Sequence, residues 1–147
     1  MRAFEPGQAA TWTKTITEAD VEAFAGITGD YNPLHVDKEY AARSRFGERI
    51  AHGILTAGMI SAVLGMRLPG PGGIFLSQTL KFVQPVRFGD TITARAEVVS
   101  WRPEKRLLIL HTTCTNQRGE AVLDGEAALL VEPVPDGPEK QEKVEQG

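Results

Sequence analysis

Cysteine is almost absent from this sequence, and histidine is scarce. One cysteine, Cys114, among 147 residues excludes a disulfide framework and a cysteine-based zinc site. Only three histidines, His35, His52 and His111, are available to a reaction that needs an imidazole. The longest apolar stretch, residues 54–66, is shorter than the ~20 residues of a membrane span. The chemistry of this protein therefore rests on few side chains.

Basic charge and the common catalytic signatures are also missing. The formal net charge of −3 argues against a nucleic-acid or anionic-membrane partner, which requires a basic surface. The glycine-rich segment 70–73 lacks the following Lys-Ser/Thr of a phosphate-binding loop. Neither a zinc-binding HExxH motif nor a GxSxG nucleophile motif occurs. The N-terminus has no apolar run typical of a secretory signal, so we expect a soluble, cytoplasmic protein with no metal site.

The composition that remains is that of one ordinary domain. Hydrophobic residues make up 41% of the chain and charged residues 24%, and the length suits a single core. From residue 133 onward the chain is rich in proline and charge and has little apolar content. We therefore predict a domain over 1–132 and a disordered tail over 133–147.

The first half of the chain has helix signals after one strand. Residues 9–16 mix β-branched and aromatic residues, which favours a strand. Thr17 and Asp20 form a variant of the capping box, and they predict a helix over 18–29 that ends at a left-handed Gly29. Pro33 predicts a bent, non-repeating loop over 30–36, and a short helix follows over 38–44.

Residues 53–68 are apolar nearly all round, which predicts a buried helix. Ala57, Ser61 and Gly65 form a stripe of small residues along it, and we expect a sheet backbone or a ligand to approach this stripe closely. Four strands joined by short turns are predicted at 74–86, 91–101, 105–116 and 121–131. This order predicts an α+β fold in which a curved antiparallel β-sheet wraps around a long central α-helix.

An acid and an imidazole, Asp30 and His35, lie on either side of Pro33. The turn can bring the two side chains toward one point, where they are suited to acid–base chemistry on a water molecule. Asn32 is expected to cap the local backbone and stiffen the loop. From the residues alone, the alternative is that Asp30 caps a loop and His35 is structural.

Gly53 stands at the predicted start of the buried helix, where backbone N–H groups are unpaired. Without a side chain, it allows a ligand carbonyl to approach those donors, as in an oxyanion hole. A tight start to the helix would require the same glycine. Ser61 is either a core serine or a hydroxyl that faces the site, whereas His111 and Cys114 are expected to be structural.

The run Phe24, Ile27, Thr28, Gly29-Asp30, Asn32-Pro33-Leu34-His35 and Ala41 resembles the hydratase 2 motif of MaoC-like (R)-specific enoyl-CoA hydratases. Phe46, Ile50, His52-Gly53 and the segment 69–86 are also similar to this family, and the similarity spans about residues 5–132. This family has the hot-dog fold and includes hydratases that feed polyhydroxyalkanoate synthesis. The resemblance therefore implies a hot-dog fold and hydration of trans-2-enoyl-CoA to (R)-3-hydroxyacyl-CoA.

The resemblance also implies a role for each site residue. Asp30 and His35 would be the catalytic pair that grips the water, with the direction of each proton transfer left open. The Gly53 N–H would bind the thioester carbonyl, Ser61 would be a minor active-site hydroxyl, and Asn32 would support the loop. The expected partner is an acyl-CoA thioester bound by a homodimer, and no cofactor is expected beyond the coenzyme A of the substrate.

Three alternatives stay open at this stage. The first is a dehydratase of 3-hydroxyacyl-ACP or of a specialised acyl-CoA. The second is a hot-dog acyl-CoA thioesterase, and the third is a module that binds acyl thioesters without catalysis. The residues that would bind the CoA phosphates are also undecided among Arg43, Arg45, Arg67, Lys81, Arg87 and Arg102.

Overall fold

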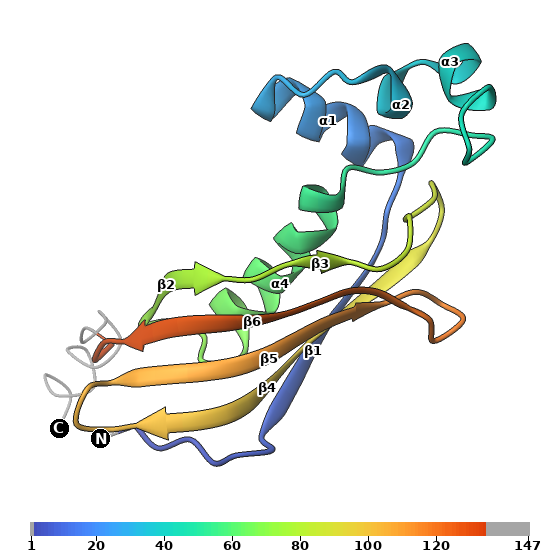
Figure 1. The fold of residues 1–147 in the computed structure, drawn as a ribbon. Helices are drawn as coiled ribbons and strands as arrows, with labels where there is room; N and C mark the ends of the chain where they lie inside the picture. The colour runs from blue at the N-terminus through green and yellow to red at the C-terminus, as the bar shows by residue number, and fades with distance from the viewer. Residues whose placement is uncertain (1, 135–147) are drawn as a thin grey trace, which may run out of the picture.

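The computed structural model describes residues 2–134, and it contains a curved antiparallel sheet packed against one long helix (Figure 1). The predicted tail lies, from residue 135 onward, outside the described residues. The elements are β1 (Ala9–Thr15), α1 (Glu18–Thr28), α2 (Pro33–Val36), α3 (Lys38–Ala42), α4 (Gly53–Met66), β2 (Gly73–Gln78), β3 (Lys81–Phe82), β4 (Thr91–Arg102), β5 (Leu107–Thr115) and β6 (Ala121–Val131). In residues 2–134 no helix is both long and apolar enough to cross a membrane.

The sheet has the strand order β1-β4-β5-β6-β2. Strand β3 also pairs with β6, next to the part of β6 that pairs with β2. Every pairing is antiparallel, as predicted for strands joined by short turns. The strand predicted over 105–116 is shorter at its start, because residues 103–106 form the turn and β5 begins at Leu107. Strand β6 has its predicted bounds.

The prediction of one strand over 74–86 is wrong. Between β2 and β3 the chain rises over Gly125 of β6, and a Cβ at that glycine would overlap the carbonyl oxygen of Thr79. The Thr79 N–H donates to Glu126 O at 2.9 Å, and the Glu126 N–H donates to Thr79 Oγ1 at 3.0 Å. These two bonds replace the regular ladder and divide the strand in two.

The core lies between α4 and the concave face of the sheet. Ile60, Val63 and Leu64 of α4 are fully buried, and they belong to one cluster with Ile92 of β4 and Leu110 of β5. Strand β4 alternates buried and more exposed positions, as expected when one face of a strand meets the core. Burial of these side chains contributes about 1.5–3 kcal/mol each relative to exposure.

Helix α4 is not buried all round, contrary to the prediction. One face of it, which carries Ile54, Gly58, Ser61 and Gly65, is exposed. Within residues 2–134, a Cβ added at Gly58 or Gly65 would meet nothing within 4 Å. The close approach to the small-residue stripe, expected of a sheet backbone or a ligand, is therefore not made by a sheet backbone among residues 2–134.

Helices α1, α2 and α3 lie together beyond the N-terminal end of α4 (Figure 1). Helix α1 begins as predicted, because the Thr17 side chain accepts from the Asp20 N–H and the Asp20 side chain accepts from the Thr17 N–H. A hydrogen bond from Lys14 lowers the pKa of the Asp20 carboxyl. The helix ends at Gly29 with φ 85°, the left-handed conformation that a glycine adopts without strain. The next residue is Asp30.

Candidate active site

The segment from Asp30 to His35 is shaped by its own side chains. The Thr28 Oγ1 accepts from the Asp30 N–H at 3.1 Å, and the Asp30 carboxylate accepts from the Asn32 N–H at 3.2 Å. The Asn32 side chain then accepts from the Leu34 N–H at 2.9 Å, so Asn32 caps the backbone as predicted. Each of these three hydrogen bonds joins residues two positions apart, so the segment forms a series of tight turns.

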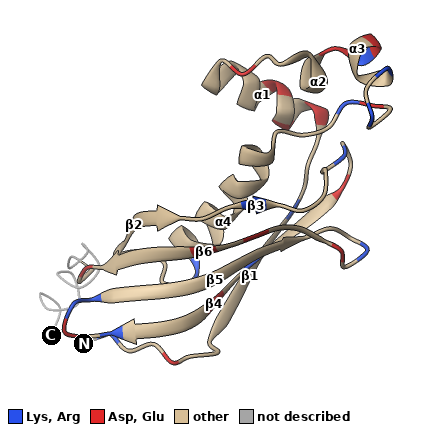
Figure 2. Ribbon diagram, viewed as in Figure 1, with Lys and Arg blue, Asp and Glu red and all other residues tan. Residues whose placement is uncertain are grey.

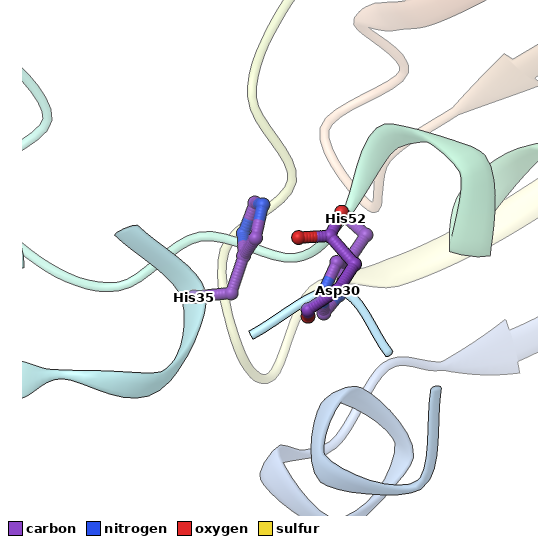
Figure 3. A group of neighbouring side chains, drawn as sticks. All are labelled: Asp30, His35 and His52. Carbon is purple, nitrogen blue, oxygen red and sulfur yellow. The ribbon is translucent and has the colours of Figure 1, made fainter. Parts of the chain in front are cut away.

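The predicted non-repeating loop over 30–36 is wrong in its second half. Pro33–Val36 form the single-turn helix α2, with Asn32 as its N-cap and Pro33 in its first turn. Proline suits that position because the N–H it lacks has no partner inside the helix. The turn places His35 on the inner side, facing the start of α4 (Figure 3).

Asp30 and His35 converge with a third residue, His52. One ligand atom from each of the three side chains lies within 4.8 Å of the other two. Figure 3 shows Asp30 beside His52 at the start of α4, with the His35 ring across from them. The side chain of Asp30 is exposed, His35 is half-buried and His52 is buried. The predicted convergence of Asp30 and His35 is present, and the participation of His52 was not anticipated.

Hydrogen bonds to backbone carbonyls determine which ring nitrogen of His35 and of His52 carries a hydrogen. The Nδ1 of His35 lies 2.7 Å from the carbonyl oxygen of Ile50, and the Nε2 of His52 lies 2.9 Å from that of Asp30. A carbonyl oxygen only accepts, so each of these nitrogens donates. In a neutral ring, the His35 Nε2 is then an unprotonated acceptor. An acceptor of this kind beside a carboxylate can exchange protons with a bound water.

Three chelating groups so close together raise the question of a metal. The rings of His35 and His52 are 3.9 Å apart between centroids and are inclined by only 30°. A ring nitrogen binds a metal in the plane of its ring at about 2.0–2.1 Å. Two near-parallel rings at this separation do not direct their lone pairs to one point. The geometry favours stacking of the two rings over shared ligation of an ion.

A cavity of about 450 Å³ opens beside these residues. His35 and Gly53 lie in its wall, and apolar side chains such as Ile54, Val86 and Leu123 form much of the remainder. Gly53 is the first residue of α4, where backbone N–H groups have no partner within the helix. The cavity therefore joins an acid–base group, a backbone donor and an apolar chamber.

The structure adds a second reason for glycine at position 53. A Cβ there would lie 2.6 Å from the Cε1 of Phe82, whose ring covers the start of α4. The sequence does not reveal this contact, because Phe82 reaches the helix only through the pairing of β3 with β6. The predicted approach of a ligand carbonyl and the contact with Phe82 both favour a residue without a side chain.

The remaining predicted residues lie farther out. Ser61 is exposed on α4, two turns from Gly53, and in the described chain neither it nor Asn32 is part of the cavity wall. His111 is exposed on β5, and its Nε2 lies 2.6 Å from the Oδ1 of Asp124. Cys114 is fully buried, and burial raises the pKa of its thiol to about 12, as suits a structural residue.

Among the residues that the structure describes, Arg45 is the only one of the six candidate ligands of the CoA phosphates that lies in the cavity wall. Arg87 pairs with Glu48 and Arg102 pairs with Glu104. Basic and acidic residues are mixed in α3 and the loop that follows, where Arg45 lies (Figure 2). The guanidinium of Arg45 lies 5.3 Å from the centroid of the Phe46 ring.

The family model of the MaoC like domain matches residues 4–117. The chain belongs to the MaoC-like family. An "(R)-specific enoyl-CoA hydratase" of Rhodospirillum rubrum is 53% identical over 125 residues, which cover 85% of this chain and 86% of the relative. A "3-hydroxybutyryl-CoA dehydratase" of Methylorubrum extorquens is 52% identical over 127 residues, which cover 86% of this chain and 80% of the relative.

A solved structure identifies the fold of this MaoC-like protein. The "(R)-hydratase from A. caviae involved in PHA biosynthesis" superimposes with a TM-score of 0.84 at 40% identity, and the match covers 92% of this chain and 100% of the other. The predicted hot-dog fold is therefore confirmed. The two curated relatives bear names of hydro-lyases, and the resemblance of this MaoC-like chain to (R)-specific enoyl-CoA hydratases is confirmed over most of its length.

Proposed function

We propose that this MaoC-like protein is an (R)-specific enoyl-CoA hydratase, which adds water to trans-2-enoyl-CoA and also runs the reverse dehydration. The observation that carries the proposal is the convergence of Asp30 and His35 beside the first residue of α4. The identity of 53% to a relative of that name supports it.

In the proposed reaction, one water molecule binds between the Asp30 carboxylate and the His35 Nε2. Its hydroxyl group adds to C3 of the enoyl thioester, and one proton is delivered to C2. The C2=C3 double bond becomes a single bond, and no electron leaves the substrate, so the reaction requires no redox cofactor. General acid–base catalysis of this kind contributes about 10²- to 10⁴-fold to a rate.

Gly53 supplies the second part of the proposed mechanism. Negative charge develops on the thioester oxygen while C3 is attacked, and it is stabilised by a backbone N–H directed at it. The N-terminus of α4 also carries a partial positive charge, which acts in the same sense. The acyl chain occupies the apolar cavity, and the coenzyme A carries the phosphates toward solvent.

The direct test is to incubate the protein with crotonyl-CoA and longer enoyl-CoA substrates and to follow the loss of enoyl absorbance. The product is then offered to a dehydrogenase specific for (S)-3-hydroxyacyl-CoA, which should not oxidise it. No turnover between C4 and C12 contradicts the proposal, as does an (S) product. Release of free thiol would indicate a thioesterase instead, and a higher kcat/KM with ACP-linked substrates would indicate an ACP dehydratase.

We also propose that the working unit is a homodimer. Strand β2 is an edge strand, and Ile74, Phe75 and Leu76 on it are exposed. An exposed apolar edge offers unpaired backbone groups to a strand of another chain. Helix α4 adds an exposed face of small residues next to Ile54, which is also apolar and exposed. Pairing of two copies through these surfaces would cover both.

Light scattering after size exclusion tests the dimer. The wild type should elute with the mass of two chains, and Leu76→Lys should shift it toward one chain. Val99→Lys, at a valine of β4 that is exposed to a similar degree, is the matched control and should stay dimeric. A monomeric wild type, or a Leu76→Lys variant that stays dimeric, would contradict this arrangement.

A further inference from the structure

His52 is the least exposed of the three histidines, with 2% of its surface accessible. It precedes α4 as the N-cap residue, yet its side chain makes no capping bond to the helix. Its ring instead packs between two others, with centroids 4.6 Å from Phe24 and 3.9 Å from His35. A buried imidazole that does not cap its own helix is held there for its contacts with the neighbouring loop.

The first of those contacts is with Asp30. The Nε2–H of His52 donates to the backbone carbonyl of Asp30 at 2.9 Å, across 22 positions in the sequence. Local bonds hold the Asp30 N–H and carboxylate, and the bond from His52 adds a tie at the Asp30 carbonyl. The bond from His52 fixes the peptide that carries the Asp30 carboxylate.

The second contact is with His35. Stacking on the His52 ring limits the tilt of the His35 ring, while the Ile50 carbonyl holds its Nδ1 at 2.7 Å. Ile50 and His52 flank Ala51, whose N–H donates to the Val86 carbonyl at 2.8 Å. The three-residue segment 50–52, which is anchored to the loop between β3 and β4, therefore positions both Asp30 and His35.

We propose that His52 is a positioning residue of the proposed hydration, and the inference rests on that function. It holds the Asp30 carboxylate through the backbone and the His35 ring through stacking, so that both groups meet the same water. Among the described residues, His52 is not part of the cavity wall, so it acts without touching the substrate. Misplacing a reacting group by about 1 Å can lower a rate about 100-fold, so the loss of either contact should be visible in kcat.

Two substitutions separate the two contacts. His52→Gln keeps an N–H that can reach the Asp30 carbonyl but removes the ring, whereas His52→Phe keeps the ring but removes the donor. With crotonyl-CoA, each should lower kcat about 10- to 100-fold and change KM much less, because the substrate is not contacted. The same pair at His111, an exposed histidine on β5, is the matched control and should leave kcat unchanged.

A double-mutant cycle distinguishes positioning from general destabilisation. If His52 acts through His35, then His52→Gln should cost little further kcat in a His35→Gln background. Wild-type kcat in either His52 variant, a loss confined to KM, or losses that multiply independently would each overturn the proposal.

Nitrogen NMR of the histidine rings gives a readout of the tautomers in the wild-type protein, without any substitution at His52. His52 should carry its hydrogen on Nε2 and His35 on Nδ1, and the ring resonances of His52 should move when His35 is replaced by Ala. The opposite tautomer of His52, or no response to His35→Ala, overturns the proposal. A wild type that shows these signals but no hydration would instead contradict the proposed function and leave the contacts of His52 established.

Discussion

The ring of Phe82 occupies the space that a side chain at Gly53 would need, with its Cε1 2.6 Å from the place of a Cβ. Strand β3 thus closes over the first turn of α4, at the donor proposed to bind the thioester oxygen. Because Phe82 is itself about half exposed, its ring has room to move away from an added methyl group. A substitution at Gly53 should therefore disturb the site more than the fold.

Gly53→Ala should lower kcat/KM for crotonyl-CoA about 10- to 100-fold while the protein stays folded, because the methyl group would obstruct the thioester oxygen. Steady-state kinetics and a thermal melt measure both effects. The decisive control is Gly53→Ala combined with Phe82→Ala. If the double variant regains the activity of Phe82→Ala alone, the ring contact caused the loss and the methyl group does not obstruct the thioester oxygen.

His35→Asn should separate the two nitrogens of His35. The asparagine amide can still donate to the Ile50 carbonyl, which the Nδ1 does now, but it offers nothing in place of Nε2. We expect kcat to fall about 10²- to 10⁴-fold with the melting temperature nearly unchanged. His111→Asn serves as the control, and a kcat near that of the wild type in His35→Asn would remove His35 from the chemistry.

Arg45→Ala tests whether this residue of the cavity wall binds a phosphate of coenzyme A. KM for crotonyl-CoA should rise about two- to fivefold at low salt, an effect of the size expected for an exposed ion pair. The rise should shrink at high salt. KM for crotonyl-N-acetylcysteamine, which lacks the phosphates, should not change. Arg102→Ala, already paired with Glu104, is the control, and an equal effect on both substrates would contradict the assignment.

Cys114 should make stability fall at high pH. Burial raises the pKa of its thiol from 9.0 to about 12, so the unfolded chain loses this proton first as the pH rises. The free energy of unfolding should therefore drop by up to about 1.4 kcal/mol per pH unit above pH 9. Urea unfolding of the wild type and of Cys114→Ala at pH 8 and pH 10 isolates this contribution. An identical pH dependence in the two proteins would contradict the burial effect.

The elements that could be predicted from the sequence are those with local signals. Thr17 and Asp20 mark the start of α1, Gly29 marks its end, and Gly53 marks the start of α4, all at the observed positions. Each signal depends on hydrogen bonds or backbone angles within a few residues, so it does not require the rest of the fold. Turns within residues 28–36 also bring Asp30 and His35 toward each other, although their final alignment depends on contacts with Ile50 and His52.

Features that depend on distant parts of the chain became visible only in the folded protein. The break between β2 and β3 depends on Gly125, the exposed face of α4 depends on which side the sheet covers, and the wall over Gly53 is Phe82. The burial of His52 against His35 depends on the anchoring of Ala51 to Val86. Contacts between residues far apart in the sequence follow from packing, and no short window of residues contains that information.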